Sequence, residues 1–359
     1  MKGLNRREFV RLAGVAASAG LAMRSGLVLA ATGADSDAAA LAHVDPELRP
    51  AAKQILGVMR QMGSIDAEHL AQLREGTPAP PQLADVPLRE MRVPASGSLP
   101  AVTVYVVNER AGEARPAILH THGGGYILGS AKSEARHLQE TARQLDCVIV
   151  SVEYRLAPEA RYSASIEDNY AGLLWLYRNA DSLGVDRSRI ALMGESAGGG
   201  HTALLAIAAR DRGEVPLVLQ ALIYPMLDDR TGSTRQLPAY MGAVGWDAPA
   251  NRFGWESFLG VEPGSTAVPA AGVPARLENL AGLAPAFVAV GGVDLFVSED
   301  IEYARRLTEA GVPAELLVIP GAFHGFDQVA SDTRLARIFT AAKFEALRRA
   351  FGMQPIALT

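Results

Sequence analysis

A serine between glycines is the first feature of this sequence that could carry chemistry. Residues 194–199 read Gly-Glu-Ser-Ala-Gly-Gly and directly follow the apolar run 190–193. The next segment, residues 201–210, is rich in alanine and leucine and favours a helix. A strand, a Gly-x-Ser-x-Gly turn and a helix together form a nucleophile elbow, in which the glycines leave room for a strained serine. Ser196 is therefore the candidate nucleophile, and the start of the following helix favours negative charge beside it.

A nucleophilic serine needs a base, and the base needs a carboxylate that orients it. Among the seven histidines, only His324 lies in a turn beyond a C-terminal strand, which suits the chain order serine, acid, histidine. Asp294 follows the predicted strand 286–290 through two glycines, so we expect it at the same edge of the sheet. Asp228 and Asp229 also come soon after a strand and remain alternatives for the acid.

A glycine-rich loop precedes the serine in the chain. Residues 122–126 read His-Gly-Gly-Gly-Tyr, and no Lys-Ser/Thr pair follows Gly129, so the loop does not match a phosphate-binding P-loop. His120 and His122 could suggest a metal site, but no further ligand follows at a suitable spacing, and we expect no metal and no cofactor. Acyl transfer needs N–H donors aimed at a developing oxyanion, and glycines let the backbone approach it closely. The backbone N–H groups of Gly123, Gly124 and Ala197 are the candidate donors.

These segments resemble, in order, the motifs of the hormone-sensitive lipase family of α/β-hydrolases, in its bacterial esterase branch. The matching segments are 122–125 (His-Gly-Gly-Gly), 154–159 (Tyr-Arg-Leu-Ala-Pro-Glu), 194–199, Tyr224-Pro225, Asp294 and 324–326 (His-Gly-Phe). The resemblance covers nearly all of the chain after residue 40, and it implies an α/β-hydrolase fold. It also implies that Ser196, Asp294 and His324 form a catalytic triad and that His122 organises its loop by hydrogen bonds. Two departures are Glu195, where the branch more often has Asp, and Leu-Phe-Val-Ser at 295–298 in place of Pro-Leu-Arg-Asp.

Strands alternating with helices predict a mostly parallel sheet covered on both faces. The hydrolase domain is expected over residues 85–355, with a helical cap insertion at about 228–283 and N-terminal cap helices within 40–80. The strands are expected at 86–93, 101–107, 115–120, 148–152, 190–193, 217–223, 286–290 and 315–319, and the helices at 45–75, 133–145, 168–179, 201–210, 298–310 and 334–351. Together the two cap segments should roof the site. Tyr126, Trp246 and Trp255 are candidates for shaping a substrate pocket, and Arg155 and Glu159 are expected to form a buried pair.

The composition and the N-terminal residues limit the partners and the cellular compartment that we expect for this protein. The 359 residues carry a formal net charge of −5, which gives no electrostatic argument for nucleic-acid binding. The only cysteine, Cys147, excludes an internal disulfide and is expected in a buried strand. Residues 1–35 contain Arg6-Arg7 followed by an apolar, Ala/Gly-rich run, which resembles a twin-arginine export signal. That run is too short and interrupted to span a bilayer, so we expect a periplasmic or secreted protein.

The resemblance and the triad together predict hydrolysis of carboxylic esters through an acyl-serine intermediate. Confined pockets in the family favour short- to medium-chain esters, which we take as the expected substrates. An amidase, carbamate hydrolase or lactonase could use the same triad, and the sequence does not separate these activities. A catalytically inactive ligand-binding protein is disfavoured because serine, acid and histidine are all present. A homodimer is an expectation from the family alone.

Overall fold

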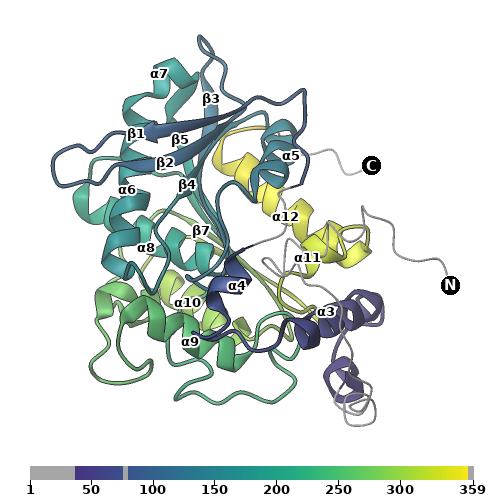
Figure 1. Ribbon diagram of the computed structural model, residues 1–359. Coiled ribbons are helices and arrows are strands. Elements are labelled where there is room, and N and C mark those ends of the chain that lie inside the picture. Colours follow the sequence, from purple (N-terminus) through teal and green to yellow (C-terminus); the bar gives the residue numbers. More distant parts are fainter. Residues whose placement is uncertain (1–36, 76–79, 355–359) are drawn as a thin grey trace.

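The computed structural model describes residues 37–75 and 80–354, so the predicted export signal at 1–35 lies outside the described residues. In this part of the chain, eight strands form one sheet in the order β1-β2-β4-β3-β5-β6-β7-β8 (Figure 1). Strand β2 is antiparallel to both neighbours, and the strands from β3 to β8 are parallel. The predicted α/β-hydrolase architecture is confirmed. The strands are β1 (Leu88–Val93), β2 (Val102–Val107), β3 (Arg115–Thr121), β4 (Val148–Glu153), β5 (Val185–Glu195), β6 (Leu219–Ile223), β7 (Ala286–Gly291) and β8 (Ala314–Ile319).

Helices cover both faces of this sheet. One face packs against α5 (Ala135–Leu145) and α12 (Arg334–Ala350), and the other against α6 (Tyr162–Arg178), α8 (Ala197–Arg212) and α10 (Val297–Glu309). All residues of β3 and β6 are buried, because parallel strands in such a sheet have helices on both sides. Cys147 is buried, as expected, but it lies just before β4 and not within the strand. Two short helices, α7 (Ala180–Leu183) and α11 (Phe326–Val329), complete the hydrolase domain.

The N-terminal segment covers the end of the sheet at which β5, β7 and β8 finish. It contains α3 (Arg49–Met62) and α4 (Leu70–Arg74), which Figure 1 shows on the same side of the molecule as α9 (Ala248–Leu259). The α3 helix begins four residues after the predicted helix start at residue 45, and Asp45 accepts the Glu47 N–H in the turn that precedes the helix. The Met59 sulfur accepts the Gly245 N–H at 3.4 Å, which ties α3 to the loop before α9.

The insertion between β6 and β7 is less helical than the sequence analysis predicted. Only α9 and the 3₁₀ turns η1 (Ala270–Gly272) and η2 (Pro274–Arg276) are regular, and turns and irregular chain make up the rest. Helix α9 begins at an Asp-x-x cap, in which Asp247 accepts the Ala250 N–H. Trp255 of α9 is fully buried in the cap core, so it does not line a pocket as expected. No helix within the described ranges has the length and apolarity needed to cross a bilayer.

Candidate active site

The chain turns sharply between β5 and α8, and Ser196 occupies the turn. Its φ of 58° and ψ of −123° are strained for a residue with a side chain. A Cβ at Gly194 would lie 2.4 Å from the Gly198 carbonyl oxygen, and a Cβ at Gly198 would lie 2.0 Å from that of Thr121, so only glycine fits either position. The Ser196 N–H donates to Ile223 O, and the Ser196 carbonyl accepts from Gly200 and Met226. These bonds hold the strained turn, as the nucleophile-elbow interpretation requires.

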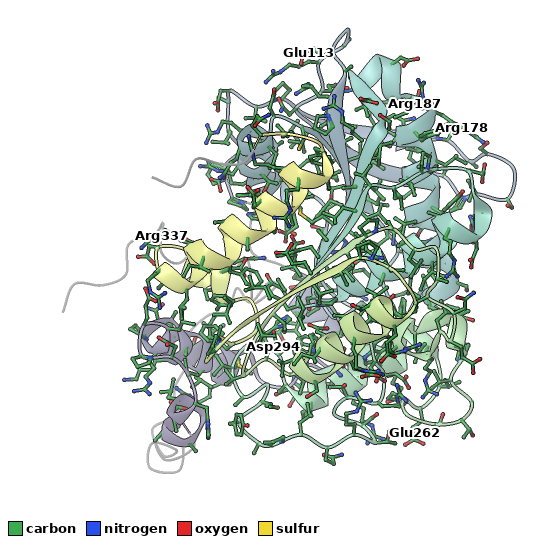
Figure 2. The ribbon with its side chains drawn as sticks, turned by 180° about the vertical axis from the view of Figure 1, so that it is seen from behind. Glu113, Arg178, Arg187, Glu262, Asp294 and Arg337 are labelled. Atoms are coloured by element: carbon green, nitrogen blue, oxygen red, sulfur yellow. The ribbon has the colours of Figure 1, made fainter. Side chains whose placement is uncertain are left out.

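The structure brings together the three predicted triad residues from the ends of three strands. His324 Nε2 lies 3.0 Å from Ser196 Oγ, and His324 Nδ1 lies 2.8 Å from Asp294 Oδ2. Asp294 lies in the turn after β7 (Figure 2), and its other carboxylate oxygen accepts the Phe296 N–H at 3.0 Å. His324 lies in the turn after β8. Because these strands are parallel, their carboxyl ends meet at one edge of the sheet and the side chains converge there.

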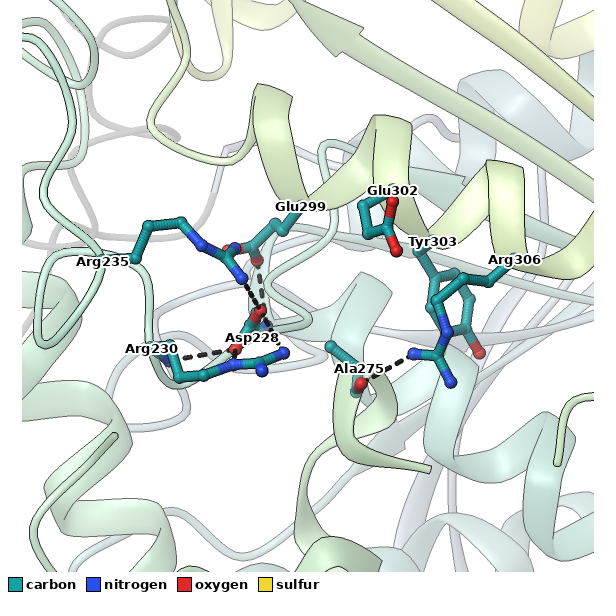
Figure 3. A pocket seen from close by; sticks show the side chains of 8 residues that line it. All are labelled: Asp228, Arg230, Arg235, Ala275, Glu299, Glu302, Tyr303 and Arg306. Carbon is teal, nitrogen blue, oxygen red and sulfur yellow. Dashed lines mark hydrogen bonds and ion pairs between the residues drawn. The ribbon is translucent and has the colours of Figure 1, made fainter. Parts of the chain in front are cut away.

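The two alternative acids have other partners. Asp228 forms ion pairs with Arg230 at 2.7 Å and Arg235 at 2.8 Å, beside a separate cleft of about 360 Å³ (Figure 3). Asp229 forms an ion pair with Arg276 at 2.6 Å. These pairs fasten the cap segment and leave Asp294 as the acid that contacts His324.

The His324 imidazole is held between aromatic rings and is almost closed off from solvent. The rings of Tyr224 and Phe296 approach it edge-on, with centroids 4.8 and 5.3 Å away. Gly245, at φ 98°, packs so closely that an added Cβ would lie 2.8 Å from the His324 carbonyl oxygen. His324 is 6% exposed, Ser196 is 8% exposed and Asp294 is fully buried. A site this enclosed excludes most bulk water, which strengthens the electrostatic interactions within it.

The glycine-rich loop lies directly over the serine. A Cβ at Gly123 would lie 3.5 Å from the Ser196 Cβ. Gly124 and Gly125 have φ values of 123° and 60°, which favour glycine. Within the described ranges, the backbone N–H groups of Gly123, Gly124 and Ala197 donate no hydrogen bond. They are therefore available to donate hydrogen bonds to an oxyanion beside the serine.

His122 supports this loop from behind. Its Nδ1–H donates to the Gly123 carbonyl at 2.8 Å, and its ring stacks on Tyr154 at a centroid distance of 4.1 Å. The Tyr154 hydroxyl donates to the His122 carbonyl at 2.6 Å. Burial lowers the pKa of His122 to about 3, so the ring is neutral at pH 7. These contacts fit the loop-organising role that the family resemblance implies.

Besides Trp255, which is buried in the cap core, the other two candidate pocket residues have different positions. Tyr126 is 1% exposed, stacks on Phe258 and donates its hydroxyl to Met226 O at 2.8 Å, so its side chain belongs to the cap core and not to a substrate pocket. Trp246 packs its ring against Gly125, where an added Cβ would lie 2.3 Å from the indole. Its Nε1–H donates to Asn251 Oδ1 at 3.2 Å. Trp246 therefore borders the glycine loop, whereas Tyr126 does not reach the site.

The predicted pairing within residues 154–159 is wrong. Arg155 forms a forked ion pair with the buried Asp168 of α6, with Nε 2.8 Å from Oδ2. Glu159 pairs with Arg74 of α4 at 2.7 Å, and both Arg155 and Glu159 are exposed. The physical reason is that helices supply the partners for both charges, so neither Arg155 nor Glu159 is buried against the other.

Sequence reasoning missed two features beside the site. Arg74 joins α4 to two segments: its Nε donates to Ile127 O, just after the glycine loop, at 2.8 Å, and its Nη2 donates to Ala157 O within residues 154–159. His120 pairs with Glu195 at 2.9 Å behind the elbow. The His120–Glu195 pair could have been predicted by looking for residues of opposite charge near the ends of neighbouring predicted strands. In the described part of the chain, no three His, Cys, Asp or Glu side chains are grouped as a metal site would need.

Comparisons with known proteins agree with this geometry. A family model described as alpha/beta hydrolase fold matches residues 118–328. Carboxylesterase NlhH of Mycobacterium tuberculosis is 36% identical over 292 residues, which cover 78% of this chain and 88% of that protein. Esterase LipI of the same organism is 37% identical over 215 residues, or 59% of this chain and 65% of LipI.

Solved structures give the same result. A structure titled "Bacterial Heroin Esterase" superposes with a TM-score of 0.76 at 33% identity, covering 87% of this chain and 99% of that chain. Esterase LipW from Mycobacterium marinum superposes with a TM-score of 0.70 at 32% identity, covering 87% and 97%. On the matched motifs, the sheet and these relatives, the chain belongs to the alpha/beta hydrolase family, in its hormone-sensitive-lipase-like branch.

Proposed function

We propose that the protein is a carboxylic ester hydrolase that works through an acyl-serine intermediate. The observation that carries this proposal is the chain of hydrogen bonds from Ser196 through His324 to Asp294. It lies beside three backbone N–H groups that donate no hydrogen bond in the described part of the chain. The names of relatives as esterases and carboxylic ester hydrolases support the same reaction class.

The proposed mechanism gives each residue a step. His324 Nε2 takes the Ser196 proton as Oγ attacks the ester carbonyl, and the carbonyl oxygen becomes an oxyanion near the N–H groups of Gly123, Gly124 and Ala197. His324 then gives its proton to the leaving alcohol, and the acyl group remains on Ser196. Water attacks this acyl-enzyme with His324 again as the base. Asp294 holds the imidazole in the required tautomer and stabilises its charged form.

We further propose short- to medium-chain esters as substrates, because the site is confined. An apolar cluster that includes Ala197, the residue directly after Ser196, combines residues of α4, the glycine loop, α8, the cap and the turn after Asp294. Its members include Trp246, which packs against Gly125, and Leu295 and Phe296, which follow Asp294, and these large side chains support a pocket of limited size. A relative named ethyl acetate hydrolase, from Pseudomonas putida, is 32% identical over 222 residues and fits this size of substrate.

The experiment is turnover of p-nitrophenyl esters of increasing acyl length by the wild type and by Ser196→Ala. We expect a pre-steady-state burst on short chains, loss of activity with long ones, and no turnover by the alanine variant. Equal inactivity of both proteins on every ester would refute the proposal. The same proteins are then assayed on an anilide and a carbamate, since faster cleavage of either would make the protein an amidase or a carbamate hydrolase.

Residues 1–35 carry a separate proposal, which is export through a twin-arginine route to the periplasm or medium. Replacing both Arg6 and Arg7 by Lys should retain the protein in the cytoplasm, as measured by cell fractionation, whereas unchanged export would contradict the proposal.

We also propose a homodimer, which is an expectation from the family, and the edge strand β8 with its exposed Leu316 is the surface that we propose for it. Sedimentation at several concentrations tests the dimer, and a monomer throughout would contradict it.

A further inference from the structure

A second line of polar side chains runs across the sheet behind the nucleophile. His120 of β3 lies between Ser151 of β4 and Glu195 of β5, with Nδ1 2.9 Å from Ser151 Oγ and Nε2 2.9 Å from Glu195 Oε2. His120 and Ser151 are fully buried and Glu195 is 5% exposed. Although the residue types match those of a triad, a fully buried Ser151 cannot meet a substrate. The role of this line must therefore be sought in what it connects.

The Glu195 carboxylate is charged in spite of its burial. Burial pushes the pKa of Glu195 upward, but the neighbouring His120 and the buried Lys343 of α12 hold it at about 2. Its second oxygen, Oε1, is buried with no hydrogen-bond partner in the described part of the chain. A buried ion pair with an unsatisfied oxygen is a weak source of stability, because desolvation offsets much of the attraction. Its clearest physical effect is to fix the distance between two strand ends.

Those two strand ends carry the two halves of the candidate site. Glu195 is the residue directly before Ser196, and His120 is separated from Gly123 by only two residues. Strands β3 and β5 are neighbours in the sheet, with Thr121 opposite Gly194. A shift between the ends of these strands would move the glycine-loop N–H groups relative to the Ser196 Oγ. The His120–Glu195 pair is one side-chain connection that opposes such a shift, and the Thr121 hydroxyl, which donates to Gly198 O at 2.7 Å, is another.

We infer that Glu195, held by His120, is a positioning residue that sets the spacing between the nucleophile and the oxyanion-binding loop. This inference rests on the proposed function. Glu195 does not touch substrate in this role, and acts through the backbone of the elbow. Misplacement of reacting groups by about 1 Å costs on the order of 100-fold in rate, so a looser elbow should reduce kcat and leave substrate binding little changed.

Three substitutions of Glu195 separate the effect of its side-chain length from the effect of its charge on the pair with His120. Glu195→Gln keeps a side chain of the same length that can hydrogen-bond to His120 Nε2, so we expect kcat to stay within about threefold of the wild type. Glu195→Asp keeps the charge but is one methylene shorter, and Glu195→Ala removes the bridge. For these two variants we expect kcat per active site to fall about 10- to 100-fold with KM within about twofold. Active-site titration by the burst of p-nitrophenol corrects for any unfolded fraction.

The matched control is Asp168→Asn, which weakens the ion pair of another buried carboxylate with Arg155. We expect it to lower Tm without changing kcat per titrated site. If Glu195→Asp and Glu195→Ala behave like this control, the inference is overturned and the pair is only structural. If Glu195→Ala does not fold, Glu195→Asp decides alone. Failure of the proposed function is recognised separately, since Ser196→Ala would then be as active or inactive as the wild type.

Discussion

Gly123→Ala is the sharpest test of the oxyanion-binding loop, because it changes one contact between this loop and the elbow that carries Ser196. Gly123 does not have a positive φ, so alanine is compatible with its backbone. The added Cβ would lie 3.0 Å from the Glu195 carbonyl oxygen, whereas ordinary contacts begin near 3.4 Å. The loop must therefore move away from the elbow by about 0.4 Å.

The size of the effect follows from the range over which hydrogen bonds act. Oxyanion donors work at about 2.7–3.1 Å, so a shift of about 0.4 Å takes a well-placed donor to the limit of this range. Complete loss of one donor costs about 100- to 1000-fold in kcat. For a weakened donor we expect about a 10- to 100-fold loss, which corresponds to about 1.4–2.7 kcal/mol in the transition state. KM should change little, since the oxyanion exists only after attack.

The assay is steady-state turnover of a short p-nitrophenyl ester, with kcat expressed per titrated serine. Gly57→Ala in α3 is the matched control, because an added Cβ there meets no atom within 4 Å. The control should keep full activity and gain about 0.5–1 kcal/mol in the free energy of unfolding. Wild-type kcat in Gly123→Ala would refute the placement of the loop as an oxyanion hole.

Three further predictions follow from other contacts. Asp294→Asn should reduce kcat about 10³- to 10⁴-fold at unchanged Tm, because the amide no longer holds the His324 tautomer; a loss below tenfold would exclude Asp294 as the orienting acid. Burial and the nearby Glu195 raise the pKa of Glu134 from 4.5 to about 7, so the folded state binds this proton more tightly and stability falls as pH rises from about 4.5 to 7. The free energy of unfolding of Glu134→Gln, measured with urea, should therefore exceed that of the wild type by up to about 3 kcal/mol at pH 8 and show no advantage at pH 4. An equal advantage at both pH values would contradict the shift. Arg74→Ala leaves the Ile127 and Ala157 carbonyls without this donor and should lower the free energy of unfolding by about 1–3 kcal/mol and raise KM; unchanged values of both would show that α4 does not cover the site.

The sequence predicts the chemistry of this site well because its signals are local. The Gly-x-Ser-x-Gly turn allows one backbone path, and the glycines at 194 and 198 are required by contacts within that turn and with β3. Asp294 and His324 could be assigned because each follows a strand whose end must lie at the same edge of a parallel sheet. The fold follows from the same alternation of strands and helices.

Side-chain partners from distant parts of the chain could not be predicted in this way. Glu159 pairs with Arg74, 85 positions away, and His120 with Glu195, 75 positions away. Tyr126 follows the glycine loop directly, but its φ of 69° places its side chain in the cap core. Position next to a motif therefore does not determine the direction of a side chain, and the partners of a surface charge depend on packing between elements.

The N-terminal segment that covers the site is joined to the opposite end of the chain. The Asp45 N–H donates to the Gly321 carbonyl at 3.0 Å, in the turn that carries His324, and the Glu47 carboxylate accepts from the first N–H groups of α12, 287 positions away. Contacts of such large sequence separation form slowly, because the long loop must close before they contribute. During synthesis, Asp45 and Glu47 leave the ribosome long before residues 321–335, so these two contacts can form only after the C-terminal part of the chain has followed. The N-terminal segment that covers the candidate site is thus among the last parts of the protein to reach its final position.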